Sequence, residues 1–255
     1  MKYYILLLFT AVVFMGCEEF VNSAEESVVT YLPKIDVEGE TEVNVPCDNT
    51  GAFEDPGAVA SEGGQEIPVK STIGGIYFDG TAINGPDLYN ITYSAYNVDS
   101  IPGVASREIF WPACNGDMIN SIAGMYEAKV FRTHTSGATV DYTEEAFDAP
   151  YWIRDLGGGK FGISDIIGYF YQSGYGYGTP YAGTGMVVTA NNIATNDFTY
   201  GDPIGVGAFG GECEIVAGSF KVNAATKTIT FSSEWSFGYV FDVTLKQVDP
   251  STFEF

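Results

Sequence analysis

Apolar and polar residues alternate along much of this chain, which is the pattern of a β-strand with one buried face. Over residues 88–96, Tyr89, Ile91, Tyr93 and Ala95 fall on one face, and mostly polar side chains fall on the other. Glycine and proline separate the apolar stretches, and a sustained helical period is almost absent. Further strands are expected at 42–45, 107–111, 124–130, 151–156, 186–189, 213–222, 228–231 and 239–248. The pattern predicts an all-β protein.

Two β-domains are expected, separated by a polar hinge. The first covers residues 28–114, and Pro112 ends its last strand because proline lacks the N–H that continues a ladder. The sequence Asn-Gly-Asp at 115–117 forms the hinge, and the second domain covers residues 118–250. A further apolar stretch at 161–171 is broken by Ser164-Asp165 and by Gly168. A small β-barrel and a second β-sandwich both fit this order of strands.

The start of the chain has the pattern of a secretion signal. Lys2 precedes an apolar run over 5–14, and Gly16 is the small residue before Cys17. Residues 1–16 are therefore predicted to be a signal peptide and Cys17 the lipidation site of a lipoprotein; the alternative is an ordinary signal peptide with a chance cysteine. The apolar run is too short to span a bilayer. Two or more acyl chains on Cys17 would give a stable membrane anchor.

Residues 17–27 are polar and acidic, which predicts a flexible tether. Glu18 and Glu19, directly after the cysteine, resemble the export signal that Bacteroidota-type lipoproteins use to reach the outer face of the outer membrane. That resemblance implies a lipid-anchored protein at the cell surface. The alternative is a solvated acidic tether, which would leave the periplasmic face open as a location.

Charge limits the classes of partner. The formal net charge is −22, with 33 Asp and Glu against 11 Lys and Arg. Such a chain repels nucleic-acid phosphates and anionic lipid headgroups, so nucleic acid is not expected as a partner. Neutral partners remain compatible with this charge.

Few residues point to catalysis. His134 is the one histidine and lies in a turn-like segment, so a zinc cluster or a Ser-His-Asp triad is not expected. Carboxylates gather at 144–148 and 212–214, and a glycosidase would need two of them held across a cleft. A run of charge in a loop is usually solvated instead. We therefore expect no enzyme, no cofactor and no metal site.

Two segments of the first domain carry a resemblance to a known family. The sequence Ala-Phe-Glu-Asp-Pro-Gly-Ala-Val-Ala at 52–60 is similar to the Tyr/Phe-x-Asp-Pro-Gly-Ala-x-Ala signature of bacterial immunoglobulin-like domains. The sequence at 89–97 matches the strand that follows in that family, with Asn97 in place of the usual aspartate. The resemblance implies an immunoglobulin-like β-sandwich over residues 28–114 that acts as a spacer or adhesion module.

The same resemblance bears on the cysteines. In immunoglobulin-like sandwiches the second half of the first strand runs parallel to the final strand, which implies that Cys47 and Cys114 lie within bridging distance. A secreted protein occupies a compartment in which disulfides persist. Cys213 would then be left over, although the sequence leaves the pairing among the three cysteines open.

The second domain carries a resemblance of its own. A leading Gly-x-Tyr at 124–126 and repeated tight turns are similar to small calycin or lipocalin-type barrels. That resemblance implies a β-barrel over residues 118–250, with a second β-sandwich as the alternative. A lipocalin-like barrel would be a carrier of a small apolar ligand.

Tyrosines gather in the glycine-rich segment 169–181, which is too short and too broken to bury all of them. An exposed ring offers an apolar face to a sugar and a hydroxyl to its polar rim. The candidate ligand-binding residues are Tyr169, Tyr171, Tyr175, Tyr177 and Tyr181, with Trp152 and Trp235 as a wall and Asp165 as an acceptor. The alternative is a structural lid of rings packed over the end of the barrel.

These features favour a non-catalytic outer-membrane lipoprotein that binds a neutral glycan at the cell surface. Lipoproteins of this composition resemble accessory members of glycan-uptake systems, in which sugar-binding proteins feed an outer-membrane transporter. The expected partners are therefore the membrane, through the lipid anchor, a neutral glycan and a transporter complex. The alternatives are a lipocalin-like carrier of a small apolar ligand and a structural or adhesion lipoprotein.

Overall fold

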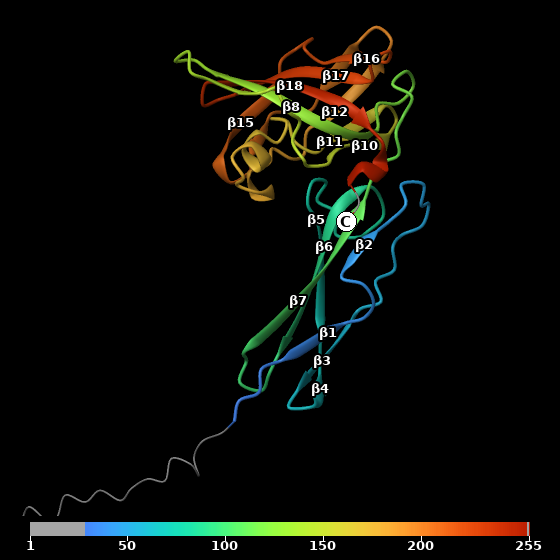
Figure 1. The fold of residues 1–255 in the computed structure, drawn as a ribbon, viewed down its shortest axis with the longest axis vertical. Helices are drawn as coiled ribbons and strands as arrows, with labels where there is room; N and C mark the ends of the chain where they lie inside the picture. Colours follow the sequence, from blue (N-terminus) through green and yellow to red (C-terminus); the bar gives the residue numbers. More distant parts are fainter. Residues whose placement is uncertain (1–28, 254) are drawn as a thin grey trace, which may run out of the picture.

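The alternating segments form strands, and the all-β class is confirmed. The computed structural model describes residues 29–253 and 255, which form a small two-sheet unit below a larger, curled sheet (Figure 1). The predicted signal peptide, Cys17 and the acidic tether lie outside the described residues.

The N-terminal unit is a sandwich of two sheets. One sheet has the order β1-β3-β4 and the other the order β2-β7-β6-β5. The strands are β1 (Lys34–Val37), β2 (Glu42–Asn44), β3 (Ala58–Glu62), β4 (Gln65–Ile67), β5 (Lys70–Gly75), β6 (Asp87–Tyr96) and β7 (Pro102–Trp111). The predicted alternation holds in β6, where Tyr89, Ile91 and Tyr93 are buried between the sheets with Ile109 of β7. Strand β2 pairs in parallel with β7, as the immunoglobulin resemblance implies for its first and last strands.

The segment around Asp55 ties this sandwich together. Asp55 forms an ion pair with Arg107 of β7, and the hydroxyl of Tyr93 donates to the same carboxylate at 2.7 Å. Arg107 is only 1% exposed, and its guanidinium also donates to the backbone oxygens of Glu38 and Glu40. A buried guanidinium needs such partners, because an unpaired charge would be costly away from water. The carboxylate of Asp55 is therefore structural.

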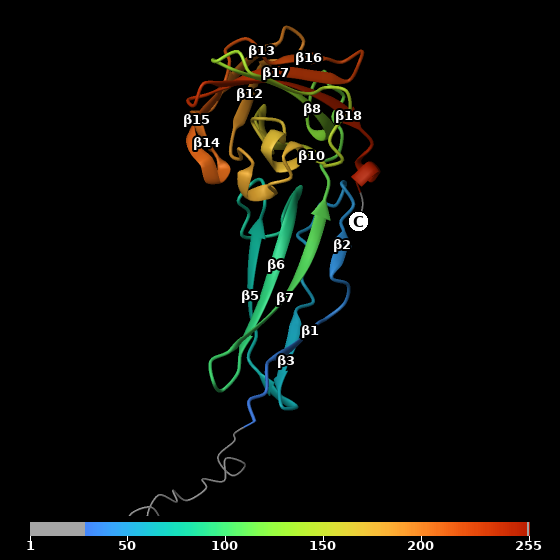
Figure 2. The same cartoon turned by 60° about the vertical axis from the view of Figure 1, so that its left-hand side comes forward.

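The C-terminal unit is one sheet of eleven strands, with the path β13-β12-β11-β10-β8-β18-β17-β15-β14; β9 adds to β8, and β16 adds to β17. The strands are β8 (Gly124–His134), β9 (Thr139–Tyr142), β10 (Tyr151–Gly157), β11 (Lys160–Ile163), β12 (Val187–Asn192), β13 (Asp197–Tyr200), β14 (Ile204–Val206), β15 (Gly210–Ile215), β16 (Lys221–Asn223), β17 (Thr228–Trp235) and β18 (Tyr239–Val248). The sheet curls into a half-barrel, and within residues 124–248 no ladder joins its edge strands β13 and β14 (Figure 2).

The hollow side of the half-barrel is occupied by the chain itself. Within the apolar stretch 161–171, strand β11 ends at Ile163, just before the expected break at Ser164-Asp165, and residues 164–171 turn inward and are all buried. In Figure 2 the sheet curves around this segment, which lies between the sheet and the sandwich. Gly168 lies so close to the sheet that a Cβ would come within 2.7 Å of Val130 and 2.8 Å of Val243. Glycine is required at this position for two reasons: the backbone lies too close to the sheet for a Cβ, and its φ is +63°.

The two units share a packed interface. Residues 76–86, between β5 and β6, bring Tyr77 into the core of the C-terminal unit, where it is 2% exposed. Its ring lies 5.1 Å from that of Trp152 and 5.6 Å from that of Tyr169. The indole of Trp152 donates to the backbone oxygen of Trp111 at 3.0 Å, which joins β10 to the end of β7.

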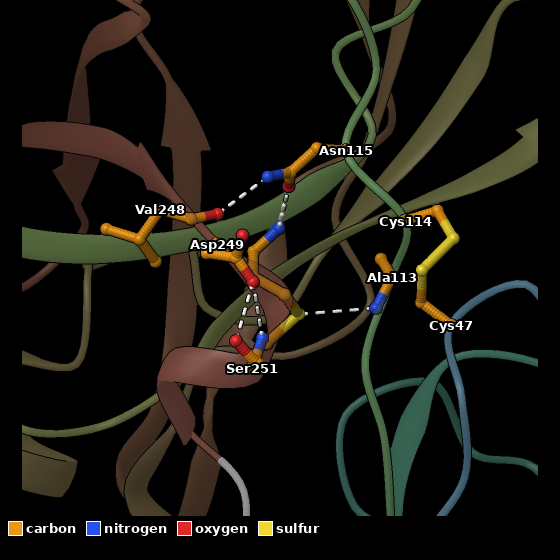
Figure 3. Close-up of a disulfide and its surroundings, with 8 residues drawn as sticks. Cys47, Ala113, Cys114, Asn115, Val248, Asp249 and Ser251 are labelled. Carbon is orange, nitrogen blue, oxygen red and sulfur yellow. Dashed lines mark hydrogen bonds between the residues drawn. A yellow bond between two sulfur atoms is a disulfide. The ribbon is translucent and has the colours of Figure 1, made fainter.

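A disulfide lies where the chain crosses from one unit to the other. It joins Cys47 to Cys114, the pair that the immunoglobulin resemblance implied, with a Cα–Cα distance of 4.9 Å (Figure 3). The next residue, Asn115, donates to the backbone oxygen of Val248 at 2.6 Å and accepts from the N–H of Met125 at 3.0 Å. The segment predicted as a polar hinge is therefore fixed by hydrogen bonds to β18 and β8 of the C-terminal unit.

Candidate functional site

Aromatic side chains form a face on the C-terminal unit, and all of them except Trp235 are exposed or partly exposed. We define this aromatic face as Tyr175, Tyr177, Tyr181, Phe209, Trp235, Phe237 and Tyr239. Tyr177 and Phe237 are the most open of them, at 52% and 53% exposure. Neighbouring rings are in contact along the face: Tyr177 is 5.2 Å from Tyr181, Tyr181 is 4.8 Å from Phe209, and Trp235 is 4.7 Å from Phe237.

Three short loops bring these rings together. The first contains the π-helical turn η1 (Phe170–Gly174) and the 3₁₀ turn η2 (Thr179–Tyr181), the second is the 3₁₀ turn η3 (Gly207–Phe209), and the third is the hairpin between β17 and β18. Backbone bonds hold the first loop, since the N–H of Tyr177 donates to the oxygen of Tyr171 and that of Tyr181 to the oxygen of Gly178, both at 3.1 Å. These bonds preorganise the rings, which lowers the entropic cost of binding a ligand.

Asp165 lies beneath this loop, and its role differs from the one predicted. It is 0% exposed, and its carboxylate accepts the N–H groups of Ile167 and Tyr169 at 2.9 Å and of Gly183 at 3.0 Å. Burial away from water raises the pKa of Asp165 to about 6, against the opposing effect of these hydrogen bonds. The carboxylate therefore positions both ends of the loop and is not an acceptor for a ligand.

Three further predicted ligand contacts are corrected by burial. Tyr169 and Trp152 are 0% exposed, and Tyr171 is 6% exposed. The hydroxyl of Tyr169 donates to Ser164 at 2.9 Å, and Trp152 lies at the interface of the two units. The reason is the inward turn at Ile163, which places this part of the segment inside the half-barrel. Only Tyr175, Tyr177 and Tyr181 of the predicted tyrosines reach the aromatic face.

Trp235 lies at the face but is largely covered. It is 5% exposed, and its indole N–H donates to the backbone oxygen of Gly210 at 3.0 Å. Beside it is an open hollow of about 220 Å³, lined by Pro203, Glu212, Glu214, Glu234, Trp235 and Ser236. Glu214 and Glu234 lie directly opposite one another on β15 and β17. Both side chains are exposed on the opposite side of the sheet from the buried Cys213 and Trp235, so the hollow is acidic.

Arg132 of β8 supports the aromatic face from behind. Its guanidinium lies 4.6 Å from the ring centre of Phe170 and 4.8 Å from that of Tyr239. It also donates to the hydroxyl of Tyr171 at 3.4 Å. A cation over the face of an aromatic ring is attracted by the ring quadrupole, so Arg132 stabilises the placement of Phe170 and Tyr239.

Sequence reasoning missed three members of the face: Phe209, Phe237 and Tyr239. A signal was present, because glycines adjoin or flank them at 207, 210 and 238, as glycines flank the tyrosines of the first loop. Treating each glycine-flanked aromatic residue as a candidate would have found them. Their convergence on one face depends on the pairing of β17 with β15 and β18, which no local pattern reveals.

Other candidate chemistry is limited. Cys213 is free and buried on β15, and burial raises the pKa of its thiol to about 12. His134 is the last residue of β8, at the edge of the predicted turn-like segment, and is half-buried beside Tyr239, at 4.5 Å between the ring centres. Within the described residues, no group of three or more His, Cys, Asp or Glu side chains is placed to hold a metal ion. No helix in that part of the chain is long and apolar enough to cross a membrane.

Comparison with known proteins identifies the family of this chain and a solved structure with a similar fold. A family model described as "-like, C-terminal domain" matches residues 115–247, more than half of the chain. The chain belongs to this family. Its matched region covers the half-barrel and its aromatic face. The crystal structure of the lipoprotein BT2262 from Bacteroides thetaiotaomicron has a similar fold, with a TM-score of 0.52 and 23% identity over 85% of this chain and 100% of that chain. The curated proteins include no match.

Proposed function

We propose that this chain is a non-catalytic, lipid-anchored protein of the outer membrane whose aromatic face binds a neutral glycan at the cell surface. In this proposal the N-terminal unit is an immunoglobulin-like spacer, and the protein is an accessory of a polysaccharide-uptake system that delivers glycan to an outer-membrane transporter. The signal pattern ending at Cys17 supports the anchor, and so does the name of the structural relative, which is a lipoprotein.

The observation that carries the glycan proposal is the exposure of contiguous rings. Tyr175, Tyr177, Phe209 and Phe237 are 40%, 52%, 39% and 53% exposed, although large aromatic side chains are usually covered in a soluble protein. Flat apolar rings match the C–H faces of sugars, and the tyrosine hydroxyls and neighbouring carboxylates supply partners for sugar hydroxyls. The net charge of −22 favours a neutral glycan over an anionic one.

The packing of the half-barrel disfavours the apolar-carrier alternative. A lipocalin-like carrier needs an enclosed apolar cavity for its ligand. Here the concave side is filled by buried side chains of the chain itself, including Ile166, Ile167, Tyr169 and Phe170. A carrier would have to expel this segment and expose its apolar surface to water.

A binding experiment on matched variants tests the glycan proposal. The soluble chain from Ser23 onward would be screened on an array of neutral and anionic glycans, as wild type and as the Tyr175→Ala/Tyr177→Ala double variant. The variant should lose affinity by about tenfold or more, because exposed aromatic anchors contribute on the order of 1 kcal/mol or more each. Tyr96→Ala is the control, since Tyr96 is 60% exposed on the other unit.

Stability measurements separate this proposal from the structural-lid alternative. Substitutions of exposed residues usually change the free energy of unfolding by less than about 0.5 kcal/mol, so the double variant should melt close to the wild type. A loss of several kcal/mol with unchanged glycan binding would identify the rings as a lid. Absence of binding to any neutral glycan would reject the glycan proposal and favour a structural or adhesion lipoprotein.

A further inference from the structure

A second exposed apolar surface lies at the opposite end of the molecule from the curled sheet. We define this membrane-end surface as Val29, Tyr31, Leu32, Tyr96, Val98 and Ile101. Val98 is 84% exposed, and Val29 and Leu32 are each 67% exposed. The residues come from the first described segment of the chain and from the hairpin between β6 and β7, which lie together at the lower end of Figure 1.

Hydrogen bonds hold these two segments against each other. The side-chain amide of Asn97 donates to the backbone oxygen of Tyr31 at 2.8 Å, and the hydroxyl of Thr30 donates to Asp99 at 2.8 Å. The apolar side chains of the two segments therefore form one surface.

The tip of the hairpin is also rigid. The side chain of Asn97 accepts the N–H of Ile101 at 2.7 Å, and Asn97 itself is only 5% exposed. The N–H of Ser100 donates to the backbone oxygen of Asn97 at 2.9 Å, which closes the turn. Val98 is thus held outward at the apex by a well-bonded loop. An apolar side chain fixed in water without a contact from the core suggests a surface that meets another apolar phase.

The position of Cys17 indicates which apolar phase this is. This step rests on the proposed lipid anchor. Residues 17–29 span at most about 43 Å even when fully extended, so an acylated Cys17 would keep the membrane-end surface within that distance of the bilayer. Tethering makes the second contact intramolecular and raises the effective concentration of the lipid surface to the millimolar range. Even a weak apolar surface then favours insertion.

The chemistry of the surface fits the boundary between headgroups and acyl chains. Valine, leucine and isoleucine side chains gain from leaving water, and tyrosine is enriched at membrane interfaces because its ring and hydroxyl suit both sides. Two nearby carboxylates are bonded within the protein, Asp99 to Thr30 and Glu62 to the N–H of Val98 at 3.0 Å. The attraction to the bilayer therefore rests on the apolar side chains, in keeping with a chain too acidic to be attracted by anionic headgroups.

We infer that the membrane-end surface inserts its apolar side chains into the bilayer beside the acyl anchor. The long axis of the protein then points away from the membrane, and the C-terminal unit, which carries the aromatic face, is held away from the bilayer by the sandwich (Figure 1). The sandwich would act as a spacer of fixed orientation, supported at two points on the membrane.

Tryptophan fluorescence of the full-length acylated protein in phosphatidylcholine vesicles tests the inference. The native tryptophans Trp111, Trp152 and Trp235 are 2%, 0% and 5% exposed, so a new surface tryptophan is readily distinguished. The Val98→Trp variant should shift its emission to shorter wavelength. It should lose about half of that added emission to brominated acyl chains, because interfacial side chains lie about 5–10 Å into the boundary region. Phe237→Trp, in the β17–β18 hairpin of the C-terminal unit, is the matched control and should show neither effect.

A further variant tests whether the native apolar side chains, and not the introduced tryptophan alone, cause the insertion. Adding Leu32→Ser and Ile101→Ser to Val98→Trp should reduce the lipid quenching, because the whole surface inserts and not the single tryptophan. Quenching equal to that of the Phe237→Trp control, with the protein still floating with vesicles, would overturn the inference and leave the anchor intact. A blue shift without lipid quenching would mean that protein covers the surface, which also overturns it. Failure to float with vesicles at all would reject the anchor and the inference together.

Discussion

The side-chain amide of Gln172 donates a hydrogen bond to the hydroxyl of Tyr77 at 2.8 Å, and this contact joins the sandwich to the loop that carries the aromatic face. Tyr77 comes from the N-terminal unit, and Gln172 lies in the turn η1 between the buried Tyr171 and the exposed Tyr175. The N-terminal unit therefore supports the loop of the aromatic face directly. Rotation of one unit against the other would break this bond and expose Tyr77, Trp152 and Tyr169.

The first prediction concerns this interface. Tyr77→Ala should lower the free energy of unfolding by about 3 kcal/mol or more, because it removes a buried aromatic ring and leaves a cavity between the units. It should also separate denaturant unfolding into two transitions, measured by circular dichroism and by tryptophan fluorescence. Tyr96→Ala, an exposed tyrosine of the same sandwich, should leave both unchanged. A single unshifted transition in Tyr77→Ala would show that the units do not depend on this contact.

The second prediction concerns the disulfide. Its two cysteines are 67 residues apart, and closing a loop of this length restricts the unfolded chain by about 4 kcal/mol on the chain-entropy model. Cys47→Ser/Cys114→Ser should lower stability by up to that amount, and reduction of the wild type should have a similar effect. Peptide mapping without reduction should find Cys47 linked to Cys114 and Cys213 as a free thiol. Cys213 linked to either of the others would contradict the structure.

The third prediction is a dependence of stability on pH. Burial raises the pKa of Asp165 from its ordinary value near 3.8 to about 6, so the folded protein binds this proton more tightly than the unfolded chain does. The resulting stabilisation is fully present below about pH 4 and is lost as the pH rises through 6. A shift of this size corresponds to on the order of 3 kcal/mol between the two limits. Stability should therefore fall from pH 4 to pH 7.

Asp165→Asn isolates this contribution in the same measurement. The variant cannot titrate at this position, so its stability should fall less steeply between pH 4 and pH 7 than that of the wild type. Repulsion among the other acidic residues acts in both proteins and cancels in the comparison. Asparagine also places a donor near one of the backbone N–H groups, so the variant should be less stable throughout. Parallel pH profiles would show that the carboxyl of Asp165 does not carry the shift.

The fourth prediction concerns the anchor, which lies outside the described residues. Cys17→Ala removes the thiol that acylation requires, so the protein should move from the membrane fraction to the soluble fraction. Sedimentation in high salt is the measurement, because salt removes charge-based attachment. Continued sedimentation of the variant under those conditions would reject the lipoprotein assignment.

A double variant tests the prediction that the acidic pair Glu18 and Glu19 directs the protein to the cell surface. Glu18→Ala/Glu19→Ala keeps the cysteine and should remain in the membrane fraction. If the acidic pair directs export, the variant should lose accessibility to protease added outside intact cells. Unchanged accessibility would identify these residues as a solvated tether.

The local pattern of apolar and polar residues determined many of the strands and which of their residues share a face. Alternation with a period of two specifies which residues of a strand share a face, and the expected strand over 239–248 is β18. The two-unit order also follows from where apolar segments stop and turn residues begin. The parallel pairing of β2 with β7, implied by family resemblance, brings Cys47 beside Cys114.

Only the tertiary structure decided which aromatic residues are free to meet a ligand. Tyr169 and Tyr177 occur in the same glycine-rich segment, yet one is 0% exposed and the other 52%. Such a segment has no period, so its sequence does not distinguish a buried ring from an exposed one. Exposure depends on the chain turning into the half-barrel after Ile163 and on loops far away in sequence, which add Phe209 and Phe237 to the face. Burial is a property of contacts between distant segments, and local sequence records only the tendency to be buried.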